Sequence, residues 1–231
     1  MKFRTDFVTN SSSSSYCVSF TVETDEHKEI SLTYWPEGED GSTEINLPLK
    51  KSINTVISQI KKCTSLAQLK ELLVNAHDLE AVFEEELEEL DNKGKKKTAD
   101  NVQLLSMLSD LGNCETEEFR TTIDTFLSEM DMLSSLDDVK SIRVSEYFSG
   151  WGEFAGDGVD EFLDAALPRG KTLDDSDDVK KAFKGKLSDE AIETIIDHVE
   201  NGSISHFDAE ITRTITLSDK KTVKTFSFSG D

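Results

Sequence analysis

The chain has 231 residues, of which 36% are hydrophobic and 31% are charged, a composition typical of a globular protein with a core of its own. Its 47 acidic and 25 basic residues give a formal net charge of −22, which opposes direct binding to nucleic acid or to an anionic membrane. We therefore expect no nucleic-acid and no membrane partner. The charge would suit basic partners, divalent cations or simple solubility, and solubility is the interpretation that the charge alone favours.

Targeting and cysteine patterns favour a cytoplasmic protein. No apolar stretch is long enough to cross a bilayer, and polar residues, among them Asp6 and five serines, follow the basic N-terminus where a signal peptide would be apolar. The three cysteines, Cys17, Cys63 and Cys114, are odd in number and form no C-x-x-C pair, which argues against disulfides and structural zinc. Each lies in an apolar run and is predicted to be reduced and largely buried.

The spacing of apolar residues predicts the elements in chain order. Alternation predicts strands over 16–23 and 30–34, which form a hairpin, and a short third strand over 45–49. Helical spacing predicts a continuous helical block over 52–136. Further elements are a strand over 139–148, helices over 159–167, 179–183 and 189–200, and strands over 207–217 and 223–228. Ser65 and Ser188 are predicted helix caps, and Asn201-Gly202 a helix end.

This order of elements predicts an α+β fold. N-terminal, central and C-terminal strands separated by helices are most simply joined in one mainly antiparallel sheet with helices on one face. We expect one monomeric domain over 1–231, in which 52–136 is a helical insertion or subdomain and 1–15 is a separate serine-tract segment.

The N-terminus carries an unusual run, Lys2 to Tyr16, which reads KFRTDFVTNSSSSSY. It resembles a signature, K-x-R-x-x-F-V-[TS]-N-S-S-S-S-S-[FY], at the start of uncharacterised bacterial and phage proteins. That resemblance is confined to this run and implies no activity, fold or catalytic residue. We expect Phe7 or Val8 to pack on the body of the protein and to order the serines, the alternative being a flexible tail. The candidate binding residues here are Phe7, Asn10, Ser11, Ser12, Ser13, Ser14 and Ser15.

A glycine-rich segment, Gly150 to Gly158, follows the central strand and is predicted to be a loop. A phosphate-binding loop would have this position, but the glycine spacing does not fit the dinucleotide fingerprint. Glu153 and Asp157 would also repel an anion. Trp151 and Phe154 are the candidate binding residues, because aromatic side chains are enriched at protein interfaces. The alternative is that both rings fold back onto the core.

Two acidic patterns are typical of metal sites but incomplete. His77, Glu80 and Glu84 have the spacing of one helical face, without a second histidine. The run 174–178 has the carboxylates of a calcium loop without its central glycine or final glutamate, and is better interpreted as the first turn of a helix. We predict no metal and no cofactor.

Three functions compete on this evidence. The sequence favours a non-enzymatic interaction protein, encoded by a phage or mobile element, that docks on another protein through its acidic surface or its serine tract. A DNA-mimicking acidic decoy is the first alternative and requires carboxylates spaced like phosphates. The second is a metal-dependent hydrolase with dispersed carboxylates, which no motif in the chain brings together.

Overall fold

The computed structural model describes residues 14–33, 48–94, 100–168, 170–173, 175–202 and 204–228, except for the side chains of Ser14, Ser15 and Glu153. Several predicted features lie outside the described residues. They are the packing of Phe7 or Val8, the candidate residues Asn10 and Ser11 to Ser13, and most of the third strand predicted over 45–49.

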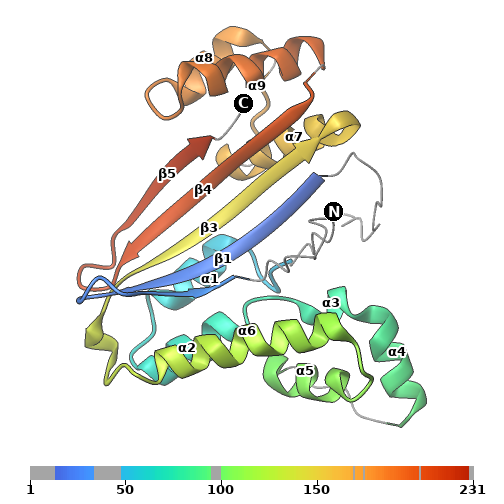
Figure 1. Cartoon of the computed structure of the whole chain (residues 1–231). Coiled ribbons are helices and arrows are strands. Elements are labelled where there is room, and N and C mark those ends of the chain that lie inside the picture. The colour runs from blue at the N-terminus through green and yellow to red at the C-terminus, as the bar shows by residue number, and fades with distance from the viewer. Residues whose placement is uncertain are drawn as a thin grey trace. The chain divides into compact units, whose positions relative to one another are not determined.

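The described strands form one sheet, in the spatial order β2-β1-β3-β4-β5 (Figure 1). Their bounds are β1 Ser14–Thr24, β2 Glu29–Leu32, β3 Val139–Trp151, β4 His206–Thr216 and β5 Thr222–Phe228. β1 and β2 form the predicted antiparallel hairpin, with Phe20 opposite Leu32. The α+β class and the antiparallel sheet built from N-terminal, central and C-terminal strands are confirmed.

Nine α-helices lie within the described residues. Most begin at a side-chain cap: Ser65, Asp100, Asn113, Asp175 and Ser188 each accept a hydrogen bond from a backbone N–H of the first turn. The helix bounds are α1 Ile53–Ile60, α2 Leu66–Val74, α3 Leu79–Val82, α4 Glu84–Asn92, α5 Asn101–Ser109, α6 Cys114–Met130, α7 Ala155–Ala166, α8 Ser176–Phe183 and α9 Asp189–Asn201. Short 3-10 turns, η1 Leu136–Asp138 and η2 Gly152–Phe154, flank β3.

The chain divides into two compact units. Unit 1 comprises residues Met1–Cys17, Ser145–Arg213 and Val223–Asp231, and unit 2 comprises Val18–Val144 and Thr214–Thr222. The helical block predicted over 52–136 therefore belongs to unit 2, together with parts of the strands. Helices α7, α8 and α9 belong to unit 1.

The three residues with metal-like spacing, His77, Glu80 and Glu84, do not lie on one helix of unit 2. His77 precedes α3, is fully buried, and lies edge-on to Phe20 with ring centroids 5.3 Å apart. Helix α3 ends at Val82 and α4 begins at Glu84, and the buried ring of Phe83 between them packs edge-on against Phe119. His77 therefore does not share a helical face with Glu80, as its spacing had suggested.

The cysteines are free, but the prediction of burial is wrong for Cys114. Cys17 is buried on β1, and burial raises the pKa of the half-buried Cys63 thiol. Cys114 is exposed at the first position of α6. The apolar stripe of α6 begins with Phe119, five residues later and therefore about 140° around the helix axis, so Cys114 faces water.

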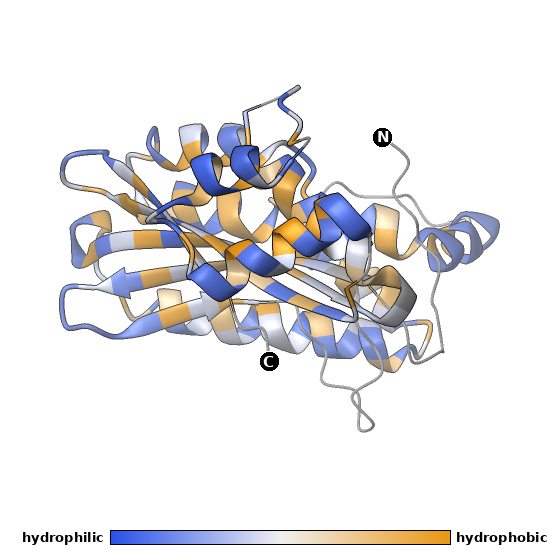
Figure 2. Cartoon of the chain, turned by 90° about the horizontal axis from the view of Figure 1, so that it is seen from above, coloured by the Kyte–Doolittle hydropathy of each residue, from blue (hydrophilic) through white to orange (hydrophobic). Residues whose placement is uncertain are grey.

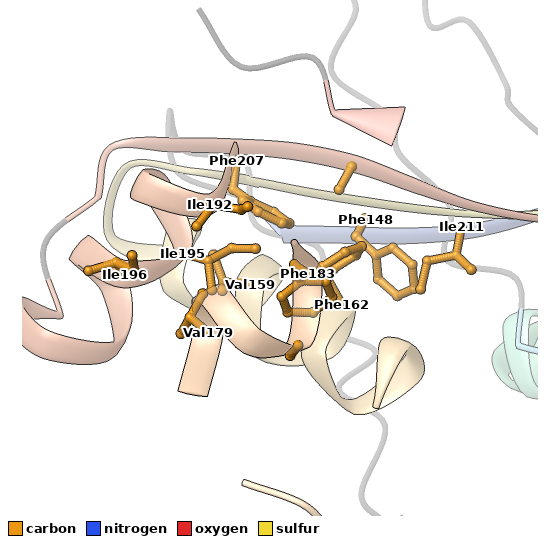
Figure 3. Close-up of a cluster of buried hydrophobic side chains, with 12 residues drawn as sticks. Phe148, Val159, Phe162, Val179, Phe183, Ile192, Ile195, Ile196, Phe207 and Ile211 are labelled. Carbon is orange, nitrogen blue, oxygen red and sulfur yellow. The ribbon is translucent and has the colours of Figure 1, made fainter. Parts of the chain in front are cut away.

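The core of unit 1 lies between one face of the strands and helices α7 to α9 (Figure 3). Phe162 of α7 is at its centre, with ring centroids 5.6 to 6.1 Å from those of Phe148, Phe183, Phe207 and Phe226. Hydrophobic and hydrophilic residues alternate along the strands (Figure 2), so one strand face supplies this core and the other is polar.

Candidate functional site

The strands of unit 1 present a polar face on the side opposite the aromatic core. On β4 the buried residues Phe207, Ala209 and Ile211 face the core, so the residues between them point the other way. The same alternation holds for β3 and β5. We call the resulting set the polar sheet face: Ser145, Tyr147, Ser149, Trp151, His206, Asp208, Glu210, Thr212, Val223, Thr225 and Ser227. Within the described part of unit 1, all three helices contribute to the core on the other side.

The predicted glycine-rich loop is not a loop, and its glycines have a packing role. β3 continues to Trp151, and α7 begins at Ala155, so only the 3-10 turn η2 separates them. A Cβ at Gly150 would lie 2.6 Å from the carbonyl oxygen of Phe154, and one at Gly158 would lie 3.0 Å from the Ser149 backbone. These glycines let the start of α7 lie directly against the end of β3.

Trp151 is fixed at the end of the polar sheet face by its neighbour on β4. Backbone hydrogen bonds from Gly152 N–H to Ser205 C=O and from Leu217 N–H to Lys140 C=O set an antiparallel register that places Trp151 opposite His206. Their ring centroids are 3.8 Å apart and the ring planes are inclined by 32°, so the two rings form a close but tilted stack. His206 Nε2 is hydrogen-bonded to Asp208 Oδ2 at 2.7 Å. Trp151 nevertheless keeps 48% of its surface exposed.

The second carboxylate of the face, Glu210, is held by hydroxyl groups. Thr212 donates to Glu210 Oε1 at 2.6 Å, and Ser227 of β5 donates to Oε2 at 3.3 Å. No position of the polar sheet face carries Lys or Arg. Within the part of the chain that the structure describes, Asp208 pairs only with His206 and Glu210 forms no ion pair. The face therefore combines negative charge with an ordered, exposed aromatic ring.

A second polar cluster is buried on the core side of the same strands. Glu146 of β3 and Arg213 of β4 form an ion pair and are only 4% and 7% exposed. Tyr16 of β1 donates to Glu146 Oε1 at 2.9 Å. Burial and the Glu146 carboxylate hold the pKa of Tyr16 well above its ordinary value, so its hydroxyl stays a donor. This cluster links side chains of three strands, β1, β3 and β4.

The ammonium group of Lys224 on β5 is bound at the C-terminal end of helix α7. Its Nζ donates to the carbonyl oxygens of Ala165 and Ala166, which are free at the C-terminal end of α7, at 3.1 Å each. It also lies 4.9 Å from the ring centroid of Phe226. Desolvation, followed by the charge of Arg213, lowers the pKa of Lys224 to about 8. The ammonium group points toward the helices, on the side of β5 opposite the polar sheet face.

The residues predicted as binding residues differ in their exposure and in whether the structure describes them. Trp151 is exposed and ordered, whereas Phe154 is half-buried in η2. Ser14 and Ser15 are the first residues of β1, so the end of the serine tract is strand backbone. Phe7, Asn10 and Ser11 to Ser13 lie outside the described residues.

Comparisons with known proteins add no relative. No family model, no curated protein and no solved structure matches this chain. Within the described residues, no group of three or more His, Cys, Asp or Glu side chains is placed to hold a metal ion. No helix in the described ranges is long and apolar enough to cross a membrane.

Sequence reasoning missed His206 as the neighbour of Trp151, and Asp208 and Glu210 as the next residues on the same face of β4. Their spacing on the polar side of a predicted strand was visible, but the register that brings β4 against β3 was not. The sequence did contain a signal for the buried ion pair. Glu146 and Arg213 each interrupt an apolar series, in phase with Val144 and Phe148 on one strand and with Ile211 and Ile215 on the other.

Proposed function

We propose that the protein is a non-enzymatic interaction module that binds a basic protein partner through the polar sheet face. The observation that carries this proposal is the Trp151–His206 stack, which holds a half-exposed tryptophan ring in one place beside Asp208. Tryptophan is among the residues that contribute most to binding at interfaces, and an ordered ring loses little conformational entropy when a partner covers it.

The charge of the molecule indicates what kind of partner this face suits. The formal net charge is −22, and the polar sheet face carries Asp208 and Glu210 with no Lys or Arg. A positively charged partner would be attracted over long range and would find complementary charge at the contact. An acidic partner would be repelled both over long range and at the contact itself. We assign the serine tract no part in this surface.

The test is capture from a lysate of the source organism on the immobilised chain, with quantitative mass spectrometry of the bound proteins. We expect at least one Lys- and Arg-rich protein that is released by salt and bound at least about tenfold less by Trp151→Ala. Met132→Ala is the matched control, because Met132 is 71% exposed but lies in unit 2, and it should capture the partner normally. Circular dichroism would confirm that both variants are folded. Identical capture by wild type and Trp151→Ala would contradict the proposal.

A further inference from the structure

We infer that the polar sheet face recognises arginine side chains in an extended segment of the partner, with one guanidinium group stacked on Trp151 beside Asp208 and a second basic side chain at Glu210. This inference rests on the proposed function and specifies the chemistry of its ligand.

The first part of the argument concerns the exposed ring. His206 covers one side of Trp151 at 3.8 Å between centroids, while 48% of the tryptophan surface remains open to solvent. A planar guanidinium group stacks on an aromatic face and can still donate hydrogen bonds in its own plane. The ammonium group of lysine is more strongly hydrated and has no planar surface to stack. The exposed ring therefore favours arginine over lysine.

The second part concerns the carboxylate next to the ring. Asp208 uses Oδ2 for its 2.7 Å bond to His206, and within the described residues its Oδ1 has no hydrogen-bond donor. Asp208 is itself half-buried, so a cation beside it would be screened less than on an open surface. A guanidinium group lying on Trp151 would be attracted by this carboxylate, because Asp208 is the next residue after His206 on the same face of β4.

The third part concerns spacing. Glu210 lies two residues beyond Asp208 on β4, which corresponds to about 7 Å along a strand. Alternate side chains of an extended partner segment have the same spacing, so an Arg-x-Arg sequence matches the two carboxylates. Both Glu210 oxygens already accept hydroxyl hydrogen bonds, which fix the carboxylate in position before a partner binds.

The experiment uses two nine-residue peptides of alternating glycine with either arginine or lysine, which carry the same charge. Binding to the full chain is measured by calorimetry at low salt. We expect the arginine peptide to bind at least about fivefold more tightly than the lysine peptide, and Trp151→Ala to abolish this preference. Glu210→Gln should weaken both peptides, and Met132→Ala should change neither. In a Trp35→Phe background, emission from Trp151 should shift when the arginine peptide binds.

Three results would overturn the inference, each in a different way. Equal binding of both peptides, unaffected by Trp151→Ala, would mean that the acidic surface attracts cations without selecting arginine. No binding of either peptide, together with loss of a captured protein in Trp151→Ala, would reject arginine recognition and leave the proposed function standing. If the protein showed no preference for the arginine peptide and captured no protein in a Trp151-dependent way, both the inference and the proposed function would be rejected.

Discussion

Replacing Arg213 alone with methionine should destabilise the protein by about 3–5 kcal/mol, measured as the free energy of unfolding in urea. The reason is that Glu146 would remain buried and, among the described residues, would keep only the Tyr16 hydroxyl as a hydrogen-bond partner, with Lys224 as a more distant positive charge. A buried carboxylate that has lost its ion-pair partner must be either desolvated while charged or protonated, and both cost free energy.

The double variant Glu146→Leu/Arg213→Met removes both charges. Its unfolding free energy therefore distinguishes the cost of one unpaired buried charge from the net contribution of the ion pair. We expect it to be much more stable than Arg213→Met alone, because burying a pair of ions costs nearly as much as their attraction returns. Tyr16→Phe, which removes only one hydroxyl, should cost about 1–3 kcal/mol. If Arg213→Met were within about 1 kcal/mol of the wild type, the pair would not be buried as described.

Phe162→Ala should cost about 3–5 kcal/mol of unfolding free energy, because it removes the ring at the centre of the unit 1 core (Figure 3). Four phenylalanine rings pack against Phe162, and they cannot all move to fill the cavity. Phe154→Ala is the matched control. Because Phe154 is only half-buried, this variant should lose clearly less unfolding free energy than Phe162→Ala. If thermal and urea unfolding showed the same loss of stability for Phe162→Ala and Phe154→Ala, Phe162 would not be central to this core.

Much of the fold could be predicted because it depends on local rules. Ser65 and Ser188 cap helices because their side chains satisfy first-turn N–H groups, and Gly202 ends α9 because its φ is 61°. The α6 stripe and the strand alternation likewise follow from periodicity alone. These features need no knowledge of distant residues.

The candidate site could be predicted only in part, because it depends on pairing across the sheet. Trp151 was recognisable as an aromatic residue near a strand end, but it was placed in a loop. The error arose because the glycines from Gly150 to Gly158 were interpreted as a loop, whereas Gly150 is a point of close backbone approach. The contact between Trp151 and His206 depends on a register that joins residues far apart in the chain. No local pattern specifies that register.

The central claim is that the polar sheet face itself, and not the general acidity of the chain, binds the partner. Asp208→Lys/Glu210→Lys reverses two charges on this face, and Glu85→Lys/Glu88→Lys reverses two exposed charges on α4 in unit 2. Both variants change the net charge of −22 by the same amount.

The decisive measurement is the affinity of the captured basic partner for these two variants at one salt concentration. We expect the substitutions on the polar sheet face to weaken binding at least about tenfold, because like charges would then meet at the contact. The substitutions on α4 should weaken it less than about twofold, through long-range attraction only. An equal loss of affinity in both variants would contradict the claim, since it would show that net charge alone attracts the partner.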